Sequence, residues 1–236
     1  MKQNSSKIDA NIEIRKKLAR LAIFTVAGVL FIDQASKIWV KTQMYLDESI
    51  SVFGDWFFIH FIENPGMAFG FEFGGEMGKL ALSLFRIVAI VFIAIYLRKL
   101  IKQEANRGLI ICVSLVLAGA AGNIIDSAFY GVIFSESPPF SPQTALMFPP
   151  DGGYSSFLHG HVVDMLYFPI IDTYWPSWLP LVGGDRLQFF RPIFNIADSA
   201  ISVGMILILF NQKRFFASEE KIGEVAESES EEGVKV

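Results

Sequence analysis

Four polar side chains interrupt an otherwise apolar stretch near the C-terminus, FNIADSAISVGMILILF at 194–210. Asn195, Asp198, Ser199 and Ser202 recur at helical spacing and would form one stripe on a helix. A carboxylate at the centre of a membrane costs about 2.5–3.5 kcal/mol even by lenient insertion scales, so it usually has a partner or a function. Ser199 and Ser202 are interpreted as packing residues. Asp198 can move a proton if a second acid lies beside it.

The composition is typical of a polytopic membrane protein. Of 236 residues, 52% are hydrophobic and 19% charged, and the mean hydropathy is +0.43, whereas soluble domains carry about 25% charged residues. About 20 apolar residues cross the hydrocarbon layer, and four such segments are predicted, at about 18–40, 80–100, 108–128 and 192–212. We therefore expect an α-helical integral membrane protein with four transmembrane helices, in which 1–212 form one membrane-embedded domain.

The distribution of Lys and Arg predicts the topology. These residues concentrate before the first span, between the second and third, and directly after the fourth, whereas the longer connections, 41–79 and 129–191, are acidic on balance. Both termini are therefore expected in the cytoplasm and both longer loops outside. Residues 213–236 are expected to form an acidic, disordered tail, because seven Glu occur from Ser218 onward.

The two outer loops differ in composition. The first contains SISVFGDWFFIHFIENPG, in which β-branched and aromatic residues predict short strands and NPG a turn. We therefore expect a small extracytoplasmic β-structure. The second is long and rich in Pro and Gly, and its Trp and Tyr suit the bilayer interface. A loop of that length in a compact protein usually has a function, such as that of a lid or docking surface.

Polar residues from three spans are predicted to reach one depth. With a rise of about 1.5 Å per residue, six of them lie just inside the outer boundary: Asp33, Lys37, Asn123, Asp126, Asn195 and Asp198. Asn64 and Asp164 in the outer loops can descend to the same level. Simpler roles remain open for some of them. Asp33 and Lys37 can form an i,i+4 ion pair, and Asn123 and Asp126 can join helices beside the small residues of GAAG.

Asp164 and Asp198 have no obvious basic partner for both, which is costly unless they share a proton. Two adjacent carboxylates do not both ionise easily, so one stays protonated near neutral pH. The charged one can take a proton from water as it attacks a carbonyl. The neutral one can donate to the carbonyl oxygen, and then the leaving amine is protonated. This is the chemistry of an aspartic protease.

Other chemistries have weaker support. HGHVVD, with His159, His161 and Asp164, could form a metal cluster, but such a pair of loop histidines is usually surface polar. HExxH and GxSxG are absent, VGGD lacks the spacing of GxGD, and no basic groove suggests nucleic acid. We expect no metal and no cofactor. The alternative function is a transporter or channel with carboxylates as a proton or cation relay, although no internal repeat supports it. A non-enzymatic membrane scaffold is a further alternative.

Five motifs in order resemble the bacterial lipoprotein signal peptidases, the signal peptidase II family: DQASK at 33–37, ENPGMAFG at 63–70, GAAGNIID at 119–126, HVVDM at 161–165 and FNIADS at 194–199. The resemblance implies a catalytic dyad of Asp164 and Asp198. It also places seven further residues at motif positions that support the site or bind substrate: Asn64, Gly66, Asn123, Asp126, Asn195, Asp33 and Lys37.

The same resemblance implies an activity. The family removes the signal peptide from diacylglyceryl-modified prolipoproteins, cutting just before the lipidated cysteine. We accordingly expect a metal-independent, multi-pass enzyme of the bacterial cytoplasmic (inner) membrane, with its site near the outer face. The expected partners are the diacylglyceryl-prolipoprotein substrate, membrane lipid and globomycin-type inhibitors, and we expect a monomer.

Two features depart from the family pattern. Ser127 follows Asp126 where family members commonly have Arg, and 37 residues separate Asp126 from Asp164 where many members have a shorter link. The missing cation leaves the charge of Asp126 to be balanced by another residue. Arg86, within the second span, is predicted to be that compensating cation.

Overall fold

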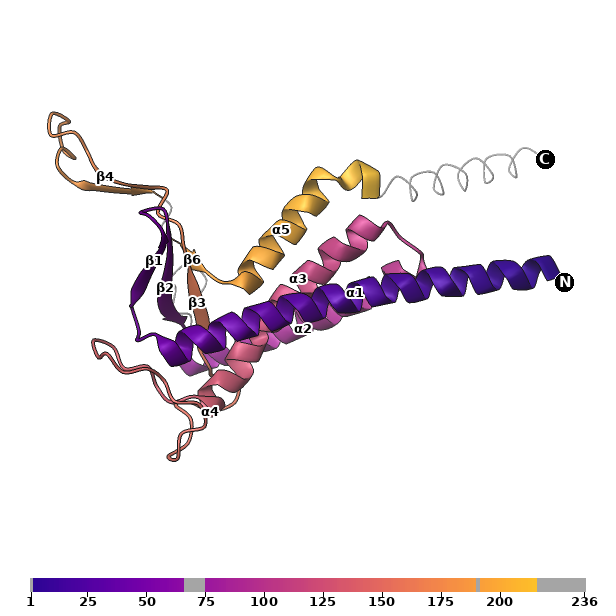
Figure 1. The fold of residues 1–236 in the computed structure, drawn as a ribbon, viewed down its shortest axis with the longest axis horizontal. Coiled ribbons are helices and arrows are strands. Elements are labelled where there is room, and N and C mark those ends of the chain that lie inside the picture. The colour runs from indigo at the N-terminus through magenta and orange to yellow at the C-terminus, as the bar shows by residue number, and fades with distance from the viewer. Residues whose placement is uncertain (1, 66–74, 190–191, 216–236) are drawn as a thin grey trace.

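The computed structural model of the protein describes residues 2–65, 75–189 and 192–215 (Figure 1). The helical elements are α1 (Lys2–Gln43), α2 (Gly75–Lys102), α3 (Arg107–Ile125), the π-helical turn η1 (Asp126–Tyr130), the short α4 (Gly131–Ile133) and α5 (Ile196–Phe210). The strands are β1 (Ser49–Phe53), β2 (Phe57–Asn64), β3 (Val162–Tyr167), β4 (Ile171–Tyr174), β5 (Arg186–Phe189) and β6 (Ile193–Phe194).

The helices confirm the membrane class predicted from composition. Within the described residues, three helices are long and apolar enough to cross a membrane, at Asp9–Gln43, Leu80–Lys102 and Arg107–Ile133. The fourth predicted segment forms a shorter apolar helix of 15 residues, α5. It begins four residues later than predicted, because Asn195 caps it. Large apolar side chains point outward from α1, α2 and α5, among them Phe31, Phe92 and Phe210, as lipid-facing helices require.

A small sheet covers one end of the helices. Its strand order is β1-β2-β3-β6, and all pairs are antiparallel. The strands expected in the first outer loop are therefore confirmed, whereas the predicted NPG turn lies partly outside the described residues. The second outer loop supplies β3 to the same sheet, and β6 follows that loop directly before α5. β4 pairs with β5 in a separate hairpin.

α3 is the central helix and packs most extensively against α5 and α1. Two glycines of the GAAG segment allow this close approach. A Cβ atom on Gly119 would lie 2.2 Å from the backbone oxygen of Ala197, and one on Gly122 would lie 2.6 Å from Asp33 Oδ2. Any side chain at these positions would displace a neighbouring helix or a carboxylate. The small residues thus bring α1, α3 and α5 together at the level of the polar residues.

Figure 1 shows the N-terminal end of α1, the connection between α2 and α3 and the C-terminal end of α5 on one side, with the sheet on the other. Arg15 Nε binds Glu104 Oε1 at 3.0 Å and joins α1 to the α2–α3 connection. The basic segments of the chain therefore lie at the end opposite the sheet.

Candidate active site

The two predicted dyad residues meet one pair of asparagine amides. Asp164 lies in β3 and is 6% exposed, and its Oδ1 accepts a 2.7 Å hydrogen bond from Asn195 Nδ2. Asp198 lies in the first turn of α5, and its Oδ1 accepts a 2.8 Å bond from Asn123 Nδ2. Asn195 Nδ2 also donates to Asn123 Oδ1 at 3.1 Å. The two carboxylates are therefore linked through two neighbouring amides.

The start of α5 fixes Asp198. Asn195 is the N-cap residue, and its side chain accepts a hydrogen bond from the backbone N–H of Asp198 at 2.9 Å. In return, Asp198 Oδ2 accepts a bond from the backbone N–H of Asn195 at 3.3 Å. This reciprocal capping box satisfies otherwise unpaired N–H groups of the helix. The capping places a carboxylate at the positive end of the helix dipole, where the two attract each other.

The pairing of β2 with β3 brings Asn64 to Asp164. In this antiparallel pair Ile62 lies opposite Asp164 and Asn64 opposite Val162. Asn64 Nδ2 donates to Asp164 Oδ2 at 3.4 Å. Gly66, the other site residue predicted in this segment, lies outside the described residues.

Lys37 occupies the centre of the polar cluster behind the asparagines. Its Nζ lies 2.9 Å from Asp33 Oδ2, 2.8 Å from Asp126 Oδ2 and 3.0 Å from Asn123 Oδ1. The side chains of Lys37, Asp33 and Asp126 are completely buried. All three ammonium hydrogens therefore have acceptors. The predicted i,i+4 ion pair of Asp33 and Lys37 is confirmed. Lys37 also binds Asn123, which in turn binds Asp198.

Each buried carboxylate is also held by a second element. Asp33 Oδ1 accepts a bond from the backbone N–H of Ala197 in α5 at 2.9 Å. Asp126 accepts bonds from Gln34 Nε2 at 2.9 Å and from the backbone N–H of Val163, next to Asp164, at 3.3 Å. The cluster consequently joins α1, α3, α5 and β3.

The predicted pairing of Arg86 with Asp126 is wrong. Lys37 holds that position, and Arg86 forms no ion pair with another described residue. The prediction compared depths only and overlooked that one ammonium can bind two carboxylates. Arg86 is half-buried on α2, and its charge interacts most strongly with Asp198, then with Asp164 and Asp126. Its field therefore acts on the candidate dyad.

Burial and the charge of Asp198 raise the pKa of Asp164 to about 7, and the hydrogen bonds from Asn64 and Asn195 only partly offset this increase. A carboxyl group with such a pKa can act as a proton donor at neutral pH. Asp198, by contrast, accepts bonds from an amide and a backbone N–H group at a helix N-terminus. The two acids thus lie in different environments, as an acid–base pair requires.

The metal alternative placed His159 and His161 with Asp164. In the structure His161 Nδ1 lies 3.1 Å from Glu63 Oε2, and His159 Nδ1 lies 3.1 Å from Ser156 Oγ. Within the described part of the chain, no three His, Cys, Asp or Glu side chains are arranged to bind a metal ion. His161, which directly precedes β3, binds Glu63, whereas Asp164 binds Asn64 and Asn195, so the two side chains do not meet.

Sequence reasoning missed several residues of these clusters. Gln34 bridges Asp33 and Asp126 through Nε2, and its Oε1 accepts a 3.2 Å bond from Tyr130. Its place inside the DQASK motif was a usable signal. Lys41 and Glu63 were also missed, and they form a second buried cluster. Lys41 follows Lys37 by one helical turn, and this spacing could have identified it.

Comparison with known proteins identifies the family of the chain. Residues 25–214 match the family described as signal peptidase (SPase) II. The chain belongs to the signal peptidase II family. Its relatives include the lipoprotein signal peptidase of Porphyromonas gingivalis, 56% identical over 77% of each chain. The lipoprotein signal peptidase of Amoebophilus asiaticus is 37% identical, over 77% of this chain and 73% of its own.

A solved bacterial membrane enzyme shares the fold. The two structures align with a TM-score of 0.51 at 24% sequence identity, covering 82% of this chain and 87% of the other. Family members are peptidases, so this signal peptidase II is an enzyme, and the transporter and scaffold alternatives are set aside.

Proposed function

We propose that this signal peptidase II is an intramembrane aspartic endopeptidase with Asp164 and Asp198 as its catalytic dyad. It removes the signal peptide from prolipoproteins. Its substrate carries diacylglycerol on the cysteine that follows the scissile bond, and the cut falls just before that cysteine. The observation that carries the proposal is the link of both carboxylates through Asn123 and Asn195, with the pKa of Asp164 raised to about 7.

The two environments assign the proton positions in the free enzyme. Asp164 is the protonated member, because it is buried and faces the charge of Asp198. Asp198 is assigned as the base, because Asn123 and the backbone N–H of Asn195 bind its oxygens. Asp198 takes a proton from water as the oxygen attacks the scissile carbonyl, while Asp164 donates to the carbonyl oxygen. The proton on Asp198 then passes to the leaving amine, and the proton on the former carbonyl oxygen returns to Asp164.

The remaining site residues hold this pair in place. Lys37 binds Asn123, the residue that donates to Asp198. Asp33 binds the first turn of α5, and Asp126 binds the backbone of β3. Asn64 binds Asp164 directly. We assign Gly66 to substrate binding from its motif position alone.

The arrangement of the helices supports a membrane setting for the proposed enzyme. We propose that this multi-pass protein of the bacterial inner membrane has both termini in the cytoplasm and the sheet outside. α5 acts as the fourth span, since 15 residues cover about 22 Å and a helical turn follows at 212–215. The dyad then lies near the outer face, where a signal-peptide helix must unwind to expose its scissile bond. Residues 1–212 form one domain, and 213–236 a cytoplasmic extension.

A cleavage assay tests the proposal. Purified protein in detergent should shorten a diacylglyceryl-modified prolipoprotein, and mass spectrometry should place the new N-terminus at the lipidated cysteine. A globomycin-type inhibitor should block the reaction, and size measurement in detergent should give a monomer. Cleavage of the lipidated substrate by the Asp164→Asn and Asp198→Asn variants at the wild-type rate would contradict the aspartic mechanism.

A further inference from the structure

A second buried cluster of charges lies outside the candidate dyad. Lys41, at the end of α1, is completely buried, and its ammonium contacts the carboxylate of Glu63 in β2. Ser137 Oγ donates to Glu63 Oε1 at 2.6 Å and lies 3.1 Å from Lys41 Nζ. His161 Nδ1 lies 3.1 Å from the other oxygen of Glu63. The cluster thus joins α1, β2, the segment 134–161 and the residue that precedes β3.

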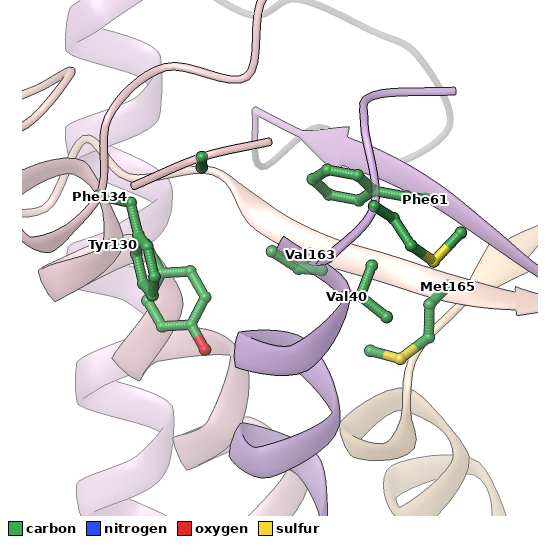
Figure 2. Packing of buried hydrophobic residues seen from close by; sticks show 8 residues of the cluster. Val40, Phe61, Tyr130, Phe134, Val163 and Met165 are labelled. Atoms are coloured by element: carbon green, nitrogen blue, oxygen red, sulfur yellow. The ribbon is translucent and has the colours of Figure 1, made fainter. Parts of the chain in front are cut away.

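This cluster faces the side of the sheet opposite the dyad. Successive side chains of a strand point to opposite faces, so Glu63 points away from the face of Asn64. Val163, opposite Glu63 in the register, likewise points away from the face of Asp164. Figure 2 shows Val163 and Met165 packed with Phe61 in a group that includes Tyr130 and Phe134.

The segment 134–161 covers this rear face. Phe134 and Ala145 belong to its hydrophobic cluster. The backbone N–H of Ala145 donates to the carbonyl oxygen of Lys41 at 3.2 Å, and that of Gly160 donates to Ser127 at 2.8 Å. A lid or docking surface was expected of the second outer loop, but this part of it packs behind the catalytic strand.

Tyr154 connects the segment to both ends of the charged cluster. Its ring lies 4.9 Å from Lys41 Nζ, within the range of a cation–π contact. Its hydroxyl accepts a 2.6 Å hydrogen bond from the backbone N–H of His161. The path from His161 to Asp164 is only three residues along the chain. A shift of the cluster is therefore transmitted to the strand that carries Asp164.

Glu63 keeps its negative charge at working pH. Burial raises the pKa of Glu63, but the hydrogen bond from His161 and the nearby ammonium of Lys41 outweigh this effect and lower it to about 2. Glu63 is therefore ionised throughout the physiological range. Such an ion pair depends on direction as well as distance, because each oxygen has its own donors.

We propose that Lys41, Glu63 and His161 are positioning residues that, with the segment 134–161, form a rear brace for β2 and β3. The brace holds Asn64 and Asp164 in register with Asp198 without touching the substrate. The effect of the brace on catalysis rests on the proposed function. Its effect on the position of β2 and β3 does not. Nothing in the motif comparison points to Lys41, which lies after the DQASK motif.

Three variants test the brace. Glu63→Gln keeps the shape of the side chain but leaves the ammonium of Lys41 without its counter-charge. Lys41→Met combined with Glu63→Leu replaces the pair by apolar groups, a change that often preserves stability. His161→Gln removes the imidazole from a side chain that is 32% exposed and strands no buried charge. His60→Gln is the matched control. His60 lies on β2, as Glu63 does, but its ring pairs with the exposed Asp47 at 2.7 Å.

Two readouts separate the brace from the proposed function. Hydrogen exchange of the 162–165 backbone, which excludes Tyr167 beside the His60 ring, should accelerate in the three variants and stay unchanged in the control, whatever the activity. With lipidated substrate, kcat should fall by about 10- to 100-fold, as expected for a displacement near 1 Å, with KM little changed. The alkaline limb of the pH profile should move to lower pH, because water reaching Asp164 favours its ionised form.

The outcomes are distinct. If the wild-type protein does not cleave, the proposed function fails and the exchange measurement still decides the brace. Unchanged exchange in the variants overturns the brace. A folded Lys41→Met/Glu63→Leu double variant with wild-type kcat and pH profile also overturns it, since the pair then contributes stability alone. If that double variant does not fold, Glu63→Gln and His161→Gln decide the question by the same criteria.

Discussion

Lys37 Nζ lies 2.8 Å from Asp126 Oδ2, and neither side chain is accessible to solvent. The same ammonium binds Asp33 at 2.9 Å, so α1 and η1 share one buried cation between two carboxylates. This relationship explains how Asp126 is balanced although Ser127 follows it. A cation from α1 serves instead of one at the neighbouring position 127 in η1.

Replacing Lys37 by Met should destabilise the protein by about 3–5 kcal/mol, because two buried carboxylates lose their counter-charge. Adding Asp126→Asn should recover part of that loss, since it removes one stranded charge. Thermal melts of the wild type, both single variants and the double variant form a cycle that measures the coupling. Arg15→Gln with Asp126→Asn is the control cycle and should be additive, because Arg15 binds Glu104 at the opposite end of the helices. Additivity in the Lys37 cycle would contradict the assignment.

Asp164→Asn and Asp198→Asn should each abolish cleavage of a lipidated prolipoprotein while leaving the protein folded. Each acid has a separate proton to move, so neither replacement is tolerated. The double variant should be no slower than either single one, because the pair acts as a unit. Substantial turnover by one single variant would remove that residue from the dyad.

Activity should decline as pH rises through about 7. Burial and the charge of Asp198 raise the pKa of Asp164 to about 7, so the proton it must donate is present below that pH and lost above it. The profile of kcat/KM reports this ionisation in the free enzyme. Asn64→Leu removes a hydrogen bond that lowers the pKa, and its alkaline limb should therefore move to higher pH. A limb that moves to lower pH in this variant would contradict the assignment of Asp164.

The sheet should lie outside the cell and the basic ends of the helices in the cytoplasm. Cysteines at Ser51 and Ser177, both exposed, in a Cys112→Ala background should react with an impermeant reagent on spheroplasts. A cysteine at Arg98, near the C-terminal end of α2, is the control and should react only after lysis. Reaction of the Arg98→Cys protein before lysis would contradict the predicted orientation in the membrane.

The sequence predicts which residues form the candidate site better than it predicts the contacts that hold them. Asp33, Lys37, Asn123, Asp126, Asn195 and Asp198 could be brought to one depth because the rise of a helix is constant. Depth alone does not determine which side chains touch. Arg86 was therefore paired with Asp126, although the direction of the Lys37 side chain decides that contact.

The rear face of the sheet is harder to predict because it depends on contacts between distant segments. The Pro- and Gly-rich composition of the second outer loop indicated an irregular chain, but it did not show that Phe134 and Ala145 pack against Val163. Glu63 stands beside Asn64 in a recognised motif, yet only the strand pairing shows that the two point to opposite faces. Local patterns predicted the elements, whereas tertiary packing determined these faces.

Gly119→Ala should reduce activity because α3 and α5 touch at this position. The added Cβ would lie 2.2 Å from the backbone oxygen of Ala197 and 2.7 Å from Ile201 Cγ1. A backbone atom cannot rotate away, so α5 must shift, and Asp198 follows Ala197 directly. We expect kcat to fall by about 100-fold, as for a displacement near 1 Å, and the free energy of unfolding to fall by about 1–3 kcal/mol from overpacking.

Gly28→Ala is the matched control: a Cβ on Gly28 of α1 meets no atom within 4 Å, so the change should leave kcat unaltered and stabilise the helix by about 0.5–1 kcal/mol. Kinetics with lipidated substrate and thermal melts measure both effects, and wild-type kcat in Gly119→Ala would show that the position of α5 does not limit catalysis.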